Sequence, residues 1–166
     1  VYFDILQSAG AGMHNVLMVG DLFTPEHSAQ MVAHPDFGLG VDAWSLSNEG
    51  GTAALTATPL SFAGHIHYLA HHVRDQHTLT LEDAVRKMTS LPAERFGLAG
   101  RGRVAERYAA DLVVFDADRV ASESTFANPR VYPTGIDYVI VNGTVVVQAG
   151  THTGARPGRV LRRTTP

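Results

Sequence analysis

Residues 138–147 restrict the fold more than any other stretch of this chain. They read Tyr-Val-Ile-Val-Asn-Gly-Thr-Val-Val-Val, so Asn142 and Gly143 separate two apolar runs rich in β-branched side chains. Asn-Gly between such runs favours the two-residue turn that joins antiparallel strands. The sequence therefore predicts a β-hairpin here, and the strand-like segments at residues 101–104 and 110–116 predict further strands.

The residues before Gly100 follow a different pattern. Helical spacing of apolar side chains predicts helices at residues 3–7, 65–75 and 80–89, followed by a short helical turn at residues 91–97 that ends on glycine. Thr24, Pro25 and Glu26 are typical of a helix start, and this helix is expected to reach Ala33. Thr80-Leu-Glu-Asp83 resembles a capping box, with Asp in place of Glu, at the start of the helix predicted at residues 80–89.

Compact apolar runs at residues 15–19 and 37–41 lie on either side of that helix. Such runs are typical of strands buried on both faces, so strand, helix and strand predict a right-handed βαβ unit in a parallel sheet. We therefore expect an α/β fold with two parts, residues 1–99 with helices and parallel strands and residues 100–166 rich in antiparallel strands.

Charge and composition argue against several classes of function. The net charge is −3, and neither sign forms long runs, so neither a nucleic-acid groove nor a membrane surface is indicated. Arg156, Arg159, Arg162 and Arg163 cluster near the end of the chain, and a solvated tail is the simplest interpretation. No apolar run approaches the length needed to cross a bilayer, and the absence of cysteine fits a reducing compartment, so we expect a cytoplasmic protein.

Asp42 is the first candidate for chemistry. It follows the apolar run at residues 37–41 and precedes a polar loop at residues 43–61. Many α/β barrels carry their catalytic groups at the ends of strands, but an Asp after a strand often only caps the next loop through its own backbone. Trp44 and Phe62 lie at the two ends of this loop, and core packing is the simpler role for both, ahead of lining a pocket.

His65 and His67 form the second candidate. On a strand, this spacing places two imidazoles on one face, as metal sites require. On a helix, His67 would instead pair with His71, one turn further along the chain. Surface or packing roles are the simpler interpretation for these histidines and for His72, while His65 and His67 remain candidates for lining a substrate pocket.

Several blocks of the chain resemble one enzyme family. Residues 79–98 (LTLEDAVRKMTSLPAERFGL), residues 108–115 (YAADLVVF), the Val-Asn-Gly hairpin and residues 152–161 (HTGARPGRVL) are similar to the C-terminal part of N-acyl-D-amino-acid deacylases. These deacylases belong to the amidohydrolase superfamily. The Phe126-Ala-Asn-Pro block and residues 152–161 are the most specific parts of this resemblance.

The resemblance implies both a fold and an activity. Residues 1–99 would form the last strands and helices of a (β/α)8 barrel, and residues 100–166 the returning strands of a small β-sandwich. The activity would be hydrolysis of N-acyl-D-amino acids by a water activated on one or two metal ions, usually zinc. Asp42 matches the family's last-strand acid, which serves as catalytic base and metal ligand.

The resemblance also implies that much of the enzyme lies outside this chain. The other metal ligands, including a His-x-His motif, would precede Val1 in the same polypeptide or lie on a companion chain, so the chain alone is expected to be inactive. Val41 and Ala43 depart from the small polar residue and the Gly that commonly flank the family's Asp, which bears on substrate preference. The partner expected is a small-molecule substrate, with no nucleic acid and no membrane.

Two other functions remain open from the sequence. One is a cyclic-amide hydrolase of the hydantoinase or dihydroorotase type, built on the same scaffold. The other is a non-catalytic binding or assembly module that lacks the metal-binding half. Metal content separates the second from an enzyme, because a single carboxylate cannot hold a catalytic zinc that normally needs three protein ligands.

Overall fold

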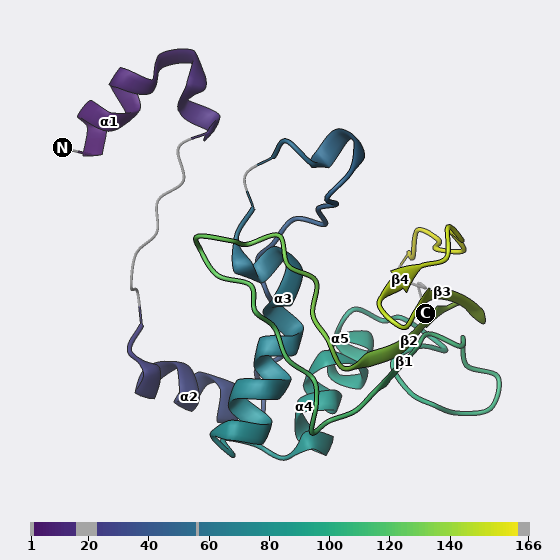
Figure 1. Cartoon of the computed structure of the whole chain (residues 1–166). Helices are drawn as coiled ribbons and strands as arrows, with labels where there is room; N and C mark the ends of the chain where they lie inside the picture. Colours follow the sequence, from purple (N-terminus) through teal and green to yellow (C-terminus); the bar gives the residue numbers. More distant parts are fainter. Residues whose placement is uncertain (1, 16–22, 56, 163–166) are drawn as a thin grey trace.

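The computed structural model describes residues 2–15, 23–55 and 57–162, and Figure 1 shows their course. The helical elements are α1 (Tyr2–Ala9), the 3-10 helix η1 (Gly10–Asn15), α2 (Pro25–Ala33), the 3-10 helix η2 (Gly50–Thr52), α3 (Pro59–His67), the π-helix η3 (Tyr68–Asp75), α4 (Leu81–Met88) and α5 (Ser90–Arg95). The strands are β1 (Leu112–Phe115), β2 (Ile136–Val141), β3 (Thr144–Gln148) and β4 (Thr151–His152). In the view of Figure 1, α1 and η1 together lie apart from the other helical elements.

Threonine caps begin two of the helices as the sequence predicts. The Thr24 hydroxyl accepts a hydrogen bond from the backbone N–H of His27 at the start of α2. The Thr80 hydroxyl accepts one from Asp83 at the start of α4. Each cap satisfies one of the backbone donors that a helix leaves unpaired in its first turn.

The helix predicted at residues 65–75 begins earlier, at Pro59. Proline suits the first helical position because its fixed φ is already helical and it has no N–H to leave unpaired. The helix then continues from α3 into η3 without a break, as far as Asp75. The short helix expected at residues 91–97 is α5, and Gly97 follows it with a φ of 66°.

The buried core lies between α3, η3 and α4. Its members are Ile66, Tyr68, Leu69, Ala84 and Val120. Val120 comes from the turn after β1, and its carbonyl accepts a hydrogen bond of 2.6 Å from Arg74 Nη1 on η3. The helical part of the chain and the strand-rich part therefore share one core.

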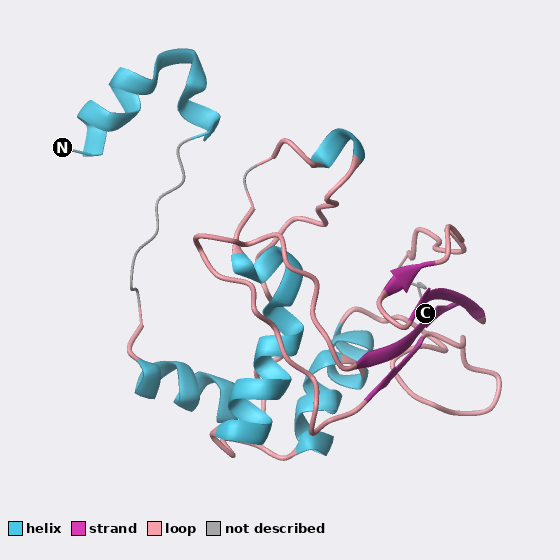
Figure 2. Cartoon of the chain, viewed as in Figure 1, coloured by secondary structure: helices cyan, strands magenta, loops and turns pink. Residues whose placement is uncertain are grey.

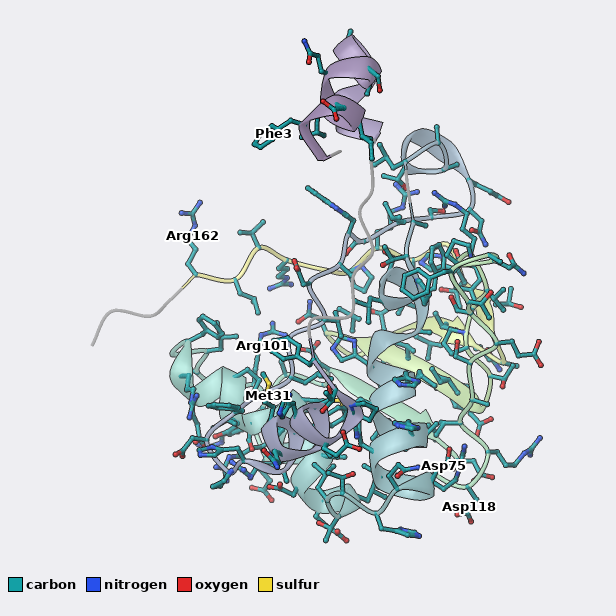
Figure 3. All side chains as sticks on the ribbon, turned by 90° about the vertical axis from the view of Figure 1, so that its left-hand side faces the viewer. Phe3, Met31, Asp75, Arg101, Asp118 and Arg162 are labelled. Atoms are coloured by element: carbon teal, nitrogen blue, oxygen red, sulfur yellow. The ribbon has the colours of Figure 1, made fainter. Side chains whose placement is uncertain are left out.

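The sheet has four antiparallel strands in the order β1-β2-β3-β4. Asn142 and Gly143 join β2 to β3 with φ values of 46° and 79°, which confirms the predicted hairpin turn. Figure 2 shows the sheet at one end of the molecule, while long irregular segments connect the other elements. Arg156, Arg159 and Arg162 are exposed, which fits the solvated tail expected from the sequence, and Arg162 extends away from the sheet in Figure 3; Arg163 lies outside the described residues.

Two strand predictions are wrong. Residues 37–41 are extended but belong to no strand, so the predicted βαβ unit does not form among the described residues. A strand needs neighbours for its backbone groups, and this segment has one backbone bond to another element, from Leu39 N to Lys87 O at 3.4 Å. The other predicted strand, at residues 101–104, is an irregular segment with a bend at residues 102–103, where Gly102 has a φ of 78°. Of the strand expected at residues 15–19, Asn15 ends η1 and the rest lies outside the described residues.

No helix in the described ranges is both long enough and apolar enough to cross a bilayer.

Candidate functional site

Asp42 lies at the end of the extended segment 37–41, where the chain leaves the helices and enters the long loop. Its side chain is exposed, and its φ of 41° is in the left-handed region. Asp tolerates this conformation better than most residues with a side chain. The backbone therefore turns sharply at this acid.

The segment that carries Asp42 is held against two helices. Leu39 bonds to the Lys87 carbonyl on α4, and a Cβ on Gly38 would come within 3.4 Å of the same oxygen. On the other side, a Cβ on Gly64 of α3 would be 2.7 Å from Val41 Cγ1. The absence of a side chain at Gly64 therefore lets Val41, the neighbour of Asp42, lie directly on the helix.

Lys87, a buried residue of α4, connects α4 to the end of α2 beside the segment at residues 37–41. Its side chain is only 1% exposed, and its ammonium group donates to the carbonyls of Val32 and His34, at the C-terminal end of α2. Helix ends leave carbonyl groups without partners and carry partial negative charge, so a cation there is stabilising. The nearest carboxylate oxygen, Asp83 Oδ2, is 3.7 Å from the same nitrogen.

A hollow of about 230 Å³ lies beside Asp42, lined by residues on both sides of it and by α3. The lining comes from Val41, Ala43, Trp44, Ser45, Leu60, Ser61, Phe62, Gly64, His65 and Ile66, and we call this the Asp42 hollow. Trp44 is 76% exposed, so core packing is wrong for this residue. Burial lowers the pKa of His65 below 6.5, so its imidazole is neutral at pH 7 and can donate or accept a hydrogen bond.

The carboxylate of Asp42 has no hydrogen bond or ion pair to any other described residue. The alternative role predicted for this Asp, capping the following loop, would require such a bond from a loop N–H. Within the loop, the described side-chain caps come from other residues: Ser47 N donates to Thr52 Oγ1, and Glu49 N donates to Ser47 Oγ. Among the described residues, the Asp42 carboxylate is therefore available to a ligand.

His67 lies in a different hollow from His65. A larger space of about 760 Å³ runs along α2 and is lined by Phe23, Thr24, Pro25, His27, Ser28, His67, His71 and His72. Residues two apart on a helix point in nearly opposite directions, which separates the two histidines. Of the pair, only His65 lines the Asp42 hollow.

The helical pairing of His67 with His71 is confirmed. Their rings stack with centroids 4.9 Å apart and planes at 11°, and His72 lies edge-on to His71, also at 4.9 Å. Burial lowers the pKa of His67 and of His72, and the neighbouring His71 lowers both further. Asp75 acts in the opposite direction on His67.

A metal centre needs more donors than this part of the molecule offers. No group of three or more His, Cys, Asp or Glu side chains among the described residues could hold a metal ion. Asp42 fits the role of a single oxygen ligand because its carboxylate is exposed and unpaired within the described structure. The remaining ligands of any such ion would have to come from outside these residues.

Three further residues that shape the region escaped the sequence analysis, namely Gly64, Lys87 and Arg130. Lys87 is the only lysine in the chain, which could have marked it as unusual. Gly64 and Arg130 have no comparable feature. Arg130 donates hydrogen bonds to a loop about 80 residues earlier in the chain, and only the folded structure brings the two together.

Comparison with protein families and curated proteins places the chain among hydrolases. The model of the Amidohydrolase family matches residues 47–147. The chain is 52% identical over 96 residues to a D-aminoacylase from Alcaligenes xylosoxydans xylosoxydans, covering 58% of this chain and 20% of that protein. It is 50% identical over 95 residues to an N-acyl-D-glutamate deacylase from the same organism, covering 57% and 19%. The chain thus spans about a fifth of these relatives.

Solved structures agree with this likeness. A D-aminoacylase studied for the functional role of its binuclear metal center superposes with a TM-score of 0.76 at 37% identity, covering 85% of this chain and 28% of that one. An N-acyl-D-glutamate deacylase from Bordetella bronchiseptica, complexed with zinc and a phosphonate inhibitor, superposes with a TM-score of 0.73 at 34% identity, covering 84% and 28%.

Proposed function

We propose a function from one premise: this chain belongs to the amidohydrolase family. We infer that it is the C-terminal part of a longer, metal-dependent enzyme that hydrolyses N-acyl-D-amino acids to a carboxylate and a free D-amino acid. Support comes from relatives about half identical to this chain, which are a D-aminoacylase and deacylases of N-acyl-D-glutamate and N-acyl-D-aspartate. This chain also superposes on solved structures of a D-aminoacylase and of an N-acyl-D-glutamate deacylase.

Within this proposal, residues 1–99 are the closing part of a (β/α)8 barrel and residues 100–166 are part of a β-sandwich. The extended segment 37–41 then becomes a barrel strand once neighbouring strands from the rest of the polypeptide supply hydrogen-bond partners. The exposed apolar side chains beside it support this view, since Phe23 is 58% exposed, Met31 44% and Phe37 47%. Side chains of this kind are normally covered in a complete domain.

Asp42 carries the proposed chemistry. A bound zinc would supply Lewis-acid polarisation and an acidic water, held mostly by ligands outside this chain. The Asp42 carboxylate would contribute one oxygen ligand, take the proton from the attacking water and pass it to the nitrogen of the leaving amine. The observation that carries this role is an exposed carboxylate without a partner among the described residues, whose chain neighbours Val41 and Ala43 line the Asp42 hollow, in a chain similar to deacylases.

The Asp42 hollow is the proposed substrate-binding surface. Its Trp44 and Phe62 side chains offer apolar contact, and neutral His65 offers a hydrogen bond to the amide or to the carboxylate of the substrate. His67 faces the larger hollow along α2, so we leave it out of this site.

Replacement of Asp42 tests the proposal in the longer polypeptide. Asp42→Asn keeps the shape of the side chain but removes its basicity, so turnover of N-acetyl-D-amino acids should fall by about a thousandfold or more. Circular dichroism should be unchanged because the side chain is exposed. Asp36→Asn, a change to another exposed acid of the same segment, is the matched control and should retain activity.

Near-normal hydrolysis by Asp42→Asn would refute the assignment. Hydantoins tested beside N-acyl-D-amino acids distinguish a cyclic-amide hydrolase, which would act on the ring substrates instead.

A further inference from the structure

The loop at residues 43–55 forms one side of the Asp42 hollow, yet little of it is regular structure. Apart from the short helix η2, its own bonds are local, such as Ser47 N to Thr52 Oγ1 at 3.0 Å. Hydrogen bonds between residues a few positions apart bend a loop but do not fix its position on the rest of the protein. Something else must hold the loop against α3.

Arg130 supplies that connection. Its Nη1 donates to the Ser47 carbonyl at 2.9 Å, and its Nη2 donates to the carbonyls of Thr52 and Leu55. In return, Asn48 Nδ2 donates to the Arg130 carbonyl at 3.3 Å. Figure 2 shows the two irregular segments passing close to each other beside α3.

The same guanidinium reaches the wall of the hollow. Arg130 Cζ lies 5.7 Å from the centroid of the Phe62 ring, within the range of a cation–π contact. Tyr132 also contacts Phe62, with the two ring centroids 5.3 Å apart. Phe62 lines the Asp42 hollow, so one side chain contacts both the loop and the hollow.

The guanidinium group of Arg130 binds the loop carbonyls and the Phe62 ring rather than a carboxylate. Over the described part of the chain, no carboxylate forms an ion pair with it, so its planar donors are satisfied by backbone carbonyls and the face of an aromatic ring. A fork of donors and a stacking plane are properties of arginine that lysine lacks.

We propose that Arg130 is a positioning residue: it holds the loop at residues 43–55 and the Phe62 ring in place as one wall of the Asp42 hollow. Where that hollow binds the substrate, which rests on the function proposed above, Arg130 sets how tightly the substrate is held without touching the reacting atoms. The position of the loop itself does not depend on the reaction.

Limited proteolysis in the longer polypeptide tests the structural part. Glu49 is the only acidic residue of the loop, so a Glu-specific protease reports on loop opening. In Arg130→Met, cleavage after Glu49 should rise about tenfold relative to cleavage after Glu82 on α4, because the charged hydrogen bonds to the loop are lost. Arg119→Met, which removes an exposed arginine elsewhere, should leave the ratio unchanged.

The ratio also separates loop release from general unfolding. An equal rise at Glu49 and Glu82 would mean that Arg130 only stabilises the whole fold, and an unchanged ratio would mean that the loop needs no such support. Either result overturns the proposal. Arg130→Lys should give an intermediate ratio, because an ammonium group can bond to a carbonyl but cannot reproduce the fork or the stacking.

Kinetics test the consequence for binding. With N-acetyl-D-amino acids, Arg130→Met should raise KM about tenfold while kcat stays within about threefold, the pattern expected when binding is lost and the chemical step is kept. An unchanged KM would overturn this role, and so would a tenfold fall in kcat without a rise in KM. If the wild-type enzyme hydrolyses none of these substrates, the proposed function fails, and the proteolysis ratio still decides whether Arg130 holds the loop.

Discussion

Asp42 directly follows Val41, and Val41 lies against α3 at Gly64, a residue without a side chain. Val41 approaches the backbone of α3 so closely that a methyl group at Gly64 would lie 2.7 Å from Val41 Cγ1. At the residue scale, the position of the candidate catalytic acid therefore depends on a contact made by its neighbour. The acid itself is exposed and makes no bond to the described residues.

Gly64→Ala should lower both stability and activity. Alanine favours a helix over glycine by about 1 kcal/mol, but overpacking against Val41 costs about 1–3 kcal/mol, so the free energy of unfolding should fall by about 1 kcal/mol. The displaced segment would also move Asp42, and turnover should drop. Urea unfolding and kcat measurements on the longer polypeptide check these outcomes.

The double variant with Val41→Ala provides the control for this prediction. Alanine at position 41 removes the Cγ1 atom that clashes, so part of the lost stability and activity should return. If the losses caused by Gly64→Ala and by Val41→Ala simply add in the double variant, the contact between Val41 and α3 does not position Asp42.

At the element scale, α2 and α4 are joined through one buried lysine. Lys87 on α4 donates to two carbonyls at the end of α2, Val32 O and His34 O, and its own carbonyl receives the N–H of Leu39. Arg86 adds a bond to the Pro35 carbonyl at 2.9 Å. The position of α2, and of the segment leading to Asp42, therefore follows from α4.

Lys87→Met should destabilise the protein strongly. Methionine fills nearly the same space but leaves the partly buried carbonyls of Val32 and His34 without this charged donor, which costs about 2–4 kcal/mol. Arg95→Met, at an exposed position on α5, should cost about 0.5 kcal/mol or less and serves as the control. A loss for Lys87→Met as small as that of the control, measured by urea unfolding, would show that the ammonium group does not hold α2.

At the scale of the whole molecule, the chain spans only part of the length of its relatives. It covers 20% of the D-aminoacylase relative and 28% of the solved D-aminoacylase structure. Its sheet is antiparallel and its core lies among helices, while the segment before Asp42 remains extended without strand neighbours in the described structure. A catalytic site that needs several metal ligands is therefore expected to form only in the longer polypeptide.

Metal analysis tests this expectation. The isolated chain of residues 1–166, loaded with zinc and passed through a desalting column, should retain less than about 0.1 ion per chain, because a stable site normally needs three or more protein ligands. The longer polypeptide should retain one or two. A full equivalent of zinc on the isolated chain, measured by mass spectrometry of the metal, would contradict the assignment of the other ligands to residues outside it.

Local interactions explain which features could be predicted from the sequence alone. The caps at Thr24 and Thr80 and the Asn142-Gly143 turn depend on contacts only a few residues apart, so their residue types were sufficient. The similarity to deacylases and the candidate role of Asp42 could likewise be inferred from the order of residues.

Only the tertiary structure decided how these parts meet. It made residues 37–41 an extended segment rather than a strand, placed His65 and His67 in different hollows, and brought Arg130 to a loop about 80 residues away. These outcomes depend on which neighbours a backbone group or a side chain finds after folding. Turns and helix caps depend on residues that are close in sequence. The partners of strands and loops come from distant segments, and these contacts form only in the folded molecule.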